Sequence, residues 1–541
     1  MKQTTTTKAA RPGHCYRGPS RRRPPLDVLI EQTRPTFEAF YIEEPKLVFA
    51  GGRVSVDPKT GIEAYGPFDL GKTPKKVRVG VIGTGVGIQR VTSYLEKCRS
   101  PLAAGFNARG KPLDLMCFPD FPGCSDDASF RCAFTTEQSI QRIIRDDSFV
   151  LAVQPATASE KLRNVVELVT KELTILADRE PLPDVVVFVM PDVVEKECAA
   201  IGAAFRGVKV VLTLGQKFER KLRKEFSKKG QTFLPFSFDV PDEERDGSQG
   251  FWNIHHALKA HCMKLNLPTQ LLWDSTLTGE GGSQDPASIA WNIFTALYYK
   301  AGNRPWHLQS LSESTCYVGV SFFKESPYAN ADMQTSLAQV FGAGEGLVLK
   351  GQKAFVDKKL DAKPHLDEKG AEQLLTQAIS LYRGQHGLPP KRVVVHKTSR
   401  YWPDELRGFR KALGAVYSYD FLTLEHLDTH FMRMGKAPPL RGTVVLLGDR
   451  NYLIYTVGYV PFLREYPGMR IPNPLEVVEH YGDSTAQTVC TEILGLTKLN
   501  WNSCAFGSSL PITIRFARDV GKILAELPPG QPPQTKYKFY M

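Results

Sequence analysis

Four polar residues between positions 255 and 300 have the chemistry to hold one phosphate group. His255 and Lys259 are four residues apart in FWNIHHALKAHC, so on a helix they share a face. Gln270 follows Pro268 at the start of the apolar run TQLLW, and Lys300 ends the apolar stretch SIAWNIFTALYYK. Ammonium groups are point-charge partners for phosphate oxygens, and amide and imidazole N–H groups donate to the same oxygens. The sequence therefore predicts an anion pocket, provided that the fold brings the four side chains together.

Each of these residues also has an ordinary structural explanation. The histidine can cap or pack a helix, the two lysines can be solvated, and the glutamine can complete a turn. Only the order and spacing of the whole set favour a binding site.

The first half of the chain predicts an α/β unit with a parallel sheet. Apolar runs at 77–83, 113–118, 184–190 and 208–214 are flanked by turn residues and alternate with amphipathic stretches such as ASEKLRNVVELVTKELTIL. Buried strands alternating with helices favour a parallel sheet. Residues 218–230 predict a strongly basic helix, most simply a solvated face.

A second α/β unit follows from about residue 275. Strands are predicted at 315–323, 345–355, 391–397, 416–424 and 442–460, and helices at 288–302, 368–385, 484–499 and 515–527. Several strands, an interposed helix and terminal helices suit an RNase H-like core.

A glycine-rich turn offers a competing interpretation. In VRVGVIGTGVGIQRVTSYL, Gly83, Gly85 and Gly87 stand between a predicted strand and a predicted helix, as in dinucleotide-binding turns. The spacing is GxGxG rather than GxGxxG, and the first acidic residue after the helix, Asp114, comes late. We favour a structural turn and keep a dinucleotide-binding oxidoreductase as an alternative.

The chain resembles the Argonaute family, and specifically its short prokaryotic branch, which has only MID and PIWI domains. The resemblance is carried by His255-x-x-x-Lys259, by Leu267-Pro268-Thr269-Gln270 and by AWNIFTALYYKAG with Lys300. YIEEPKLVFAGG resembles the start of short Argonautes, and LGLTKLNWNS followed by LPITIRFARDVGKIL resembles the end of PIWI domains. The similar region runs from about residue 40 to the C-terminus.

This resemblance implies an α/β fold with a Rossmann-like MID domain plus an RNase H-like PIWI domain. We expect a disordered basic tail over 1–38, N-terminal strands and a linker over 39–75, the MID domain over 76–274 and the PIWI domain over 275–541. No N-terminal or PAZ domain fits before residue 76.

The resemblance also implies roles for the pocket residues. Lys259, Gln270 and Lys300 are expected to bind the 5′ phosphate of a guide strand, and His255 to stack on or bond to its first nucleotide. In many family members the C-terminal carboxylate reaches this pocket and joins a divalent ion on the guide phosphates. That carboxylate belongs here to Met541, and a bridging Mg²⁺ is chemically reasonable.

Target cleavage is not expected. Cleaving Argonautes hold two metal ions about 3.5–4 Å apart with a cluster of acids. Where the family has its first and third acids, this chain shows Ser321 in VGVS and Lys397 in HKT, which we interpret as degenerate positions. Glu345 and Asp357 lie near the place of the second acid, but one carboxylate makes no two-metal site. An active slicer is kept as the alternative.

Charge and composition add a general argument. The chain has 69 Lys and Arg against 57 Asp and Glu, a net charge of +12, and a pI of about 9.1. This excess favours a polyanionic partner, although many basic proteins bind no nucleic acid. Without an apolar run of 18 residues or metal-ligand spacing among its ten cysteines, the chain is expected to be cytoplasmic, with reduced thiols.

Together these features predict the sensor subunit of a prokaryotic immune system. By resemblance, it binds a small guide RNA and a complementary single-stranded DNA target without slicing. The expected partner is a separate APAZ-containing effector protein, most often an NAD-consuming TIR or sirtuin-like enzyme and sometimes a nuclease. Activation of that partner would defend against plasmids and phage through death or dormancy of the host.

Overall fold

The computed structural model describes most of the chain between residues 37 and 541. The described residues are 37–72, 76–105, 113–155, 158–198, 253–279, 285–312, 314–324, 333–341, 346–356, 363–427, 429–435, 438–468, 471–528 and 530–541. The tail up to residue 36, the strand expected at 208–214, the basic helix expected at 218–230, and Glu345 and Asp357 lie outside them. The statements below concern the described residues.

The first sheet is parallel throughout, as the alternation of apolar runs and helices predicts. Its strand order is β5-β4-β7-β8, and β6 pairs with β4 on the edge opposite β7, following β5. The strands are β4 (Lys76–Gly83), β5 (Ala133–Thr135), β6 (Gln141–Ile143), β7 (Val185–Met190) and β8 (Thr269–Trp273). All six residues of β7 are buried, as expected for a central strand covered on both faces.

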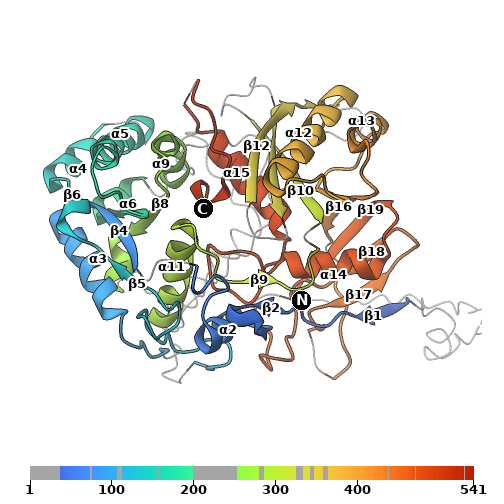
Figure 1. Ribbon diagram of the computed structural model, residues 1–541, viewed down its shortest axis with the longest axis horizontal. Helices are drawn as coiled ribbons and strands as arrows, with labels where there is room; N and C mark the ends of the chain where they lie inside the picture. The colour runs from blue at the N-terminus through green and yellow to red at the C-terminus, as the bar shows by residue number, and fades with distance from the viewer. Residues whose placement is uncertain are drawn as a thin grey trace, which may run out of the picture. The chain divides into compact units, whose positions relative to one another are not determined.

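Helices cover both faces of this sheet (Figure 1). Apolar residues of α3 (Gly85–Lys97) belong to one core cluster, and those of α5 (Ala158–Ala177) and α9 (Ile254–Cys262) belong to another. The short helices α4 (Asp146–Ala152), α6 (Asp192–Cys198) and α10 (Asp274–Thr278) complete this part.

The glycine-rich turn is explained by packing. A Cβ on Gly83 would lie 2.3 Å from Val189 Cγ1, and one on Gly87 would lie 2.9 Å from the same atom. Thr84 caps α3 by accepting a bond from the Gly87 N–H at 3.0 Å. Close approach to β7 therefore accounts for two of the glycines without a dinucleotide.

One strand prediction in this half is wrong. Residues 113–118, LDLMCF, form a turn in which the Phe118 N–H donates to the Asp114 carbonyl at 2.8 Å. Leu115 and Met116 are exposed, so the apolar run does not enter the core.

The second sheet has nine strands in the order β1-β17-β18-β19-β16-β15-β10-β11-β12. They are β1 (Ala39–Tyr41), β10 (Thr315–Lys324), β11 (Met333–Phe341), β12 (Gly346–Lys353), β15 (Arg392–Lys397), β16 (Ser418–His426), β17 (Thr443–Leu446), β18 (Tyr452–Ile454) and β19 (Leu475–Gly482). Neighbours β10, β15 and β16 run parallel, and the other pairs are antiparallel. The expected strand at 442–460 is the hairpin β17–β18. The sequence did not predict β11 and β19, because polar residues interrupt MQTSLAQVF and LEVVEHYG.

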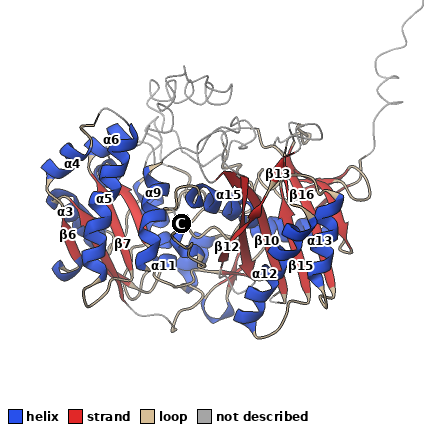
Figure 2. Ribbon diagram, turned by 90° about the horizontal axis from the view of Figure 1, so that it is seen from above, coloured by secondary structure: helices blue, strands red, loops and turns tan. Residues whose placement is uncertain are grey.

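Helices lie against both faces of the nine-stranded sheet (Figure 2). Cys316, Val318 and Val320 of β10 pack in one cluster with α12 (Glu368–His386) and α13 (Pro403–Leu413). Tyr317 and Phe323 alternate with them and pack in the cluster of α14 (Ala486–Leu496) and α15 (Ile512–Leu524).

The other strands and helices lie outside the two large sheets, and their strands form two small sheets, β3-β2-β9 and β13-β14. These elements are β2 (Leu47–Val48), β3 (Val54–Ser55), α2 (Pro58–Tyr65), β9 (His307–Leu308), β13 (Phe355–Val356), β14 (Pro364–His365), α11 (Pro286–Lys300) and the 3-10 helix η5 (Tyr537–Phe539). Residues 39–541 form one compact unit, and one core cluster contains residues of α3, α11 and α15. No described helix is long and apolar enough to cross a membrane.

Candidate phosphate-binding site

The fold brings together the four residues that the sequence singled out. Helix α9 carries His255 and Lys259, strand β8 carries Gln270, and Lys300 is the last residue of α11. The Lys259 ammonium donates to the Thr269 carbonyl, and the Lys300 ammonium donates to the Gln270 side-chain Oε1. The two lysines are near enough for each to affect the pKa of the other.

Both lysine side chains are enclosed, with Lys259 2% exposed and Lys300 0% exposed. Burial lowers the pKa of Lys259 to about 7. Burial, and then the charge of Lys259, lower the pKa of Lys300 well below its ordinary value. Among the described residues, no carboxylate contributes to either shift. Two buried ammonium groups without an acid are costly unless an anion joins them, so this pair is suited to bind one.

His255 lies half-buried beside the lysine pair. Burial and the charges of Lys259, His256 and Lys300 lower its pKa well below the ordinary value, so the ring is neutral near pH 7. A neutral imidazole offers one N–H donor and a flat face. Both properties suit contact with a base or sugar next to an anion held by the lysines.

Gln270 has a narrower role than its side chain would allow. Its Nε2 donates to the Leu271 carbonyl at 2.9 Å, and its Oε1 receives the Lys300 ammonium. In this arrangement Gln270 orients Lys300. The Thr269 carbonyl does the same for Lys259, a backbone contribution for which the sequence has no signal.

The chain ends beside this site. The C-terminus lies near α9, α11 and α15 in both views (Figures 1 and 2). Met541 is 3% exposed and belongs to the core cluster that contains α11 and α15. No described group of three His, Cys, Asp or Glu side chains could hold a metal ion. A divalent ion next to Met541 would therefore need phosphate oxygens and water as further ligands, as is usual for Mg²⁺.

Ser321 and Lys397 do not form one site. Ser321 alternates with the β10 residues that pack towards α12 and α13, so it lies on the α15 side. Lys397 pairs with Val320 and lies on the opposite face, where its ammonium donates to both Glu405 carboxylate oxygens at 2.6 and 2.5 Å. Strand register thus points Lys397 into a structural ion pair, away from the face that carries Ser321, and its interpretation as a degenerate metal-ligand position stays a prediction. The next residue, Thr398, is not an acid either.

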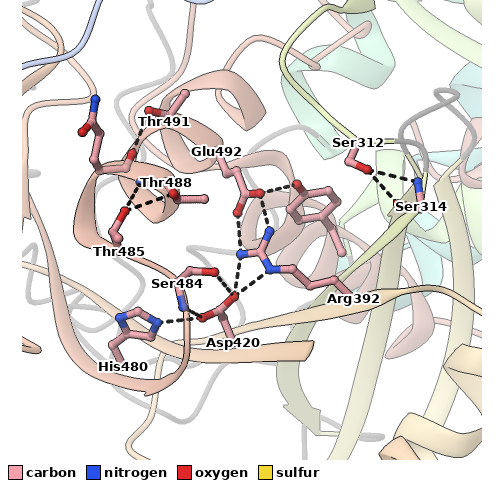
Figure 3. A network of polar contacts seen from close by, with 12 residues as sticks. Ser312, Ser314, Arg392, Asp420, His480, Ser484, Thr485, Thr488, Thr491 and Glu492 are labelled. Atoms are coloured by element: carbon pink, nitrogen blue, oxygen red, sulfur yellow. Dashed lines mark hydrogen bonds and ion pairs between the residues drawn. The ribbon is translucent and has the colours of Figure 1, made fainter. Parts of the chain in front are cut away.

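Other acids of this sheet are paired as well. Figure 3 shows Arg392, the first residue of β15, between Asp420 and Glu492. The closest contact of the guanidinium to each carboxylate is 2.5 Å, and His480 Nε2 bonds to Asp420 at 2.8 Å. Burial alone would raise the pKa of Asp420, but the His480 bond and the Arg392 charge lower it. This network lies at the end of β15 remote from Lys397 and contains its own cation.

No protein-family model matches the chain. A curated relative, the Argonaute protein of Aquifex aeolicus, is 22% identical over 273 residues, which is 50% of this chain and 36% of the relative. The structure of Clostridium butyricum Argonaute bound to a guide DNA and a 19-mer target DNA is 15% identical. Its TM-score is 0.58, and the matched region covers 91% of this chain and 54% of the Clostridium butyricum chain. Marinitoga piezophila Argonaute, in complex with a 5′ OH guide RNA, gives a TM-score of 0.51 at 12% identity. There the coverage is 90% of this chain and 59% of the other.

These comparisons confirm the predicted fold class, an α/β architecture with MID-like and RNase H-like PIWI parts. The chain spans about a third of the curated relative and just over half of each solved structure. Over half its length this chain is similar in sequence to the Aquifex aeolicus Argonaute, and over most of its length it is similar in fold to the Argonautes of Clostridium butyricum and Marinitoga piezophila.

Proposed function

We propose that this chain binds the 5′ phosphate of a small guide RNA and uses the guide to recognise complementary single-stranded DNA without cutting it. The observation that supports this most directly is the buried pair Lys259 and Lys300, which has no acidic partner among the described residues. A phosphate would supply the missing negative charge and several acceptor oxygens at once.

The nature of the guide's 5′ end does not follow from the fold. The Marinitoga piezophila Argonaute, a protein of similar fold, forms a complex with a 5′ OH guide RNA, so Argonaute architecture is compatible with guides that lack the phosphate. The lysine pair is what argues for a phosphorylated end here. His255 lies within range of both charges and is proposed to contact the first nucleotide.

We also propose that Mg²⁺ accompanies the guide. The Met541 carboxylate would be the protein ligand, with guide phosphate oxygens and water as the others. The ion would neutralise phosphate charge near the end of α9. Lys259, Lys300 and Gln270 would position the phosphate itself.

The absence of slicing is proposed on two residues. Neither Ser321 nor Lys397, the two positions interpreted as degenerate, can supply the negative charge of a metal-binding acid, and the Lys397 ammonium is paired with Glu405. The role in a larger system is proposed from the family resemblance. An APAZ-containing effector, of TIR, sirtuin-like or nuclease type, would be switched on by target pairing and would defend the host by abortive infection.

The test uses the purified chain, with its effector partner where the two are co-expressed. Bound nucleic acid is extracted and sequenced, and affinities are measured for 5′-phosphorylated and 5′-hydroxyl forms of one guide RNA. We expect short RNA in the wild type, and its loss in the variant Lys259→Ala/Lys300→Ala. Equal retention by the double variant would refute the pocket.

Two alternatives give different results in the same preparation. An active slicer would cut a complementary DNA once, at a fixed distance from the guide 5′ end, when Mg²⁺ or Mn²⁺ is added. A dinucleotide-binding oxidoreductase would bind NAD and carry no RNA. The packing of Gly83 and Gly87 against Val189 argues against the latter.

A further inference from the structure

Helix α9, which carries His255 and Lys259, is hydrogen-bonded near both ends to the segment that follows α15. Residues 526–528 and 530–541 follow α15, and we call them the C-terminal strap. At the N-terminus of α9, the Glu526 carboxyl Oε1 accepts a hydrogen bond from the Asn253 backbone N–H at 3.0 Å. Asn253 is the residue that caps α9.

The same strap supplies two donors at the other end of α9. Gln531 Nε2 donates to the Ala260 carbonyl at 2.7 Å. Gln534 Nε2 donates to the Met263 carbonyl at 2.9 Å and to Asn266 Oδ1 at 2.5 Å. Ala260 lies in the last turn of α9, where carbonyls lack partners inside the helix. Met263 begins the 3-10 turn η4 (Met263–Leu265) that follows, and its carbonyl also accepts from the Asn266 N–H at 3.2 Å, so the two glutamine amides fasten this end of α9 and the turn after it.

The strap is fixed to the other half of the protein. Beyond Gln534, the Thr535 carbonyl accepts from the Val348 N–H of β12 at 2.6 Å. Tyr537 stacks on Phe516 of α15, and η5 contacts α11, the helix that ends in Lys300. One segment therefore touches both helices that supply the lysines.

We propose that Gln531 and Gln534 are positioning residues for the phosphate pocket. By tying the C-terminal end of α9 to a segment anchored on β12 and α15, they keep Lys259 in register with Lys300. This inference rests on the proposed function and adds to it the device that aligns the two charges. An anion bridged by two ammonium groups is sensitive to small displacements of either one, so loss of the tie reduces phosphate recognition before it unfolds the protein.

The test is the variant Gln531→Glu/Gln534→Glu. Glutamate is close in shape to glutamine but cannot donate to the Ala260 and Met263 carbonyls. The matched control is Gln373→Glu/Gln377→Glu, which adds the same charge on the exposed face of α12. The measured quantity is the ratio of affinities of the full chain for 5′-phosphorylated and 5′-hydroxyl guide RNA. We expect this ratio to fall about tenfold or more in the strap variant and to stay unchanged in the control.

The outcomes separate the two proposals. If the wild type shows no preference for the phosphate, the pocket assignment fails and the inference fails with it. If the wild type shows the preference and the strap variant keeps it, only the inference is overturned. An equal loss of affinity for both guides also overturns it, because that result describes general destabilisation. Gln531→Glu alone gives the same readout if the double variant does not fold.

Discussion

Buried lysines occur in two contrasting settings in this protein. Lys397 is 0% exposed and lies against the Glu405 carboxylate, with the rings of Phe322 and Tyr401 5.5 and 5.0 Å from its ammonium. Lys259 and Lys300 are equally enclosed, but the Lys259 ammonium donates to a backbone carbonyl and the Lys300 ammonium to a side-chain amide oxygen, with no carboxylate of the described residues joining them. The first setting is complete without a ligand and the second is not.

A third lysine is intermediate between these two. Lys498 shares the Glu44 carboxylate with Arg441, at 2.9 and 3.0 Å. Burial lowers the pKa of Lys498 to about 8, although Glu44 opposes the shift. Lys397 thus has one carboxylate to itself, Lys498 shares one with Arg441, and Lys259 and Lys300 have none among the described residues. A buried lysine by itself therefore does not indicate an anion site; a buried lysine that lacks a carboxylate partner does.

The largest effect is expected from removing the two lysine charges that lack a carboxylate partner, with side chains of similar volume in their place. In Lys259→Met/Lys300→Met, affinity for 5′-phosphorylated guide RNA should fall about 100-fold or more, because two charge-assisted contacts are lost. The free energy of unfolding should stay the same or rise, since the variant no longer buries unpaired ammonium groups. Guide titration and urea unfolding check the two parts. Reduced stability with unchanged guide affinity would make this pair structural, like Lys397.

The opposite pattern is expected at the partnered site. Lys397→Met leaves Glu405 buried without its cation and should cost about 3–5 kcal/mol of unfolding free energy. The double variant Lys397→Met/Glu405→Gln should recover much of that loss. Lys411→Met, which breaks the exposed pair with Glu368, is the control and should leave stability nearly unchanged. If a Lys397 variant stayed stable but lost guide affinity, Lys397 would belong to the binding site and would not be a structural residue.

The sequence grouped the residues of one of these settings and carried no signal for the partner in the other, for a physical reason. Helical periodicity puts His255 and Lys259 on one face, and the order and spacing of the motif add Gln270 and Lys300. The direction of Lys397 depends on the register of β15 against β10 and on Glu405 of α13. A family motif places Lys397 near an active site, but only the sheet shows which face it occupies.

The contacts that support the pocket had no sequence signal at all. Gln531 bonds to Ala260 and Gln534 to Met263, in each case 271 residues earlier in the chain. The strap is rich in proline and glutamine and has no periodicity from which a partner could be predicted. The parallel sheet and most helices, by contrast, follow from apolar runs and helical periodicity, which are local properties.

A smaller effect is expected in the pH dependence of guide affinity, which also separates Lys259 from the lysines that have a carboxylate partner. In the free protein Lys259 has a pKa of about 7, and a bound phosphate favours its charged form. Binding therefore takes up protons above pH 7, and affinity for the phosphorylated guide should fall about tenfold between pH 7 and 9. The guide phosphate titrates near pH 6, below this window. A 5′-hydroxyl guide, and the variant with methionine at both positions, should show no such slope. A slope shared by both guides would assign the titration elsewhere, for example to Lys498.

The smallest effect concerns Glu526, a buried acid at the N-terminus of α9. Burial raises the pKa of Glu526 to about 8, although the Asn253 N–H lowers it in part, and no cation contributes to the shift. Between the ordinary value of 4.5 and pH 8 the folded protein keeps a proton that the unfolded chain has lost, so stability falls as the pH rises through this window. Glu526→Gln keeps an acceptor for Asn253 and cannot ionise. Relative to the wild type, the variant should be neutral at pH 4.5 and more stable by on the order of 1 kcal/mol at pH 8, measured by urea unfolding. If the difference were the same at both pH values, Glu526 would be ionised in the folded state. An unseen cation would then complete its site, just as we expect an anion to complete the site of Lys259 and Lys300.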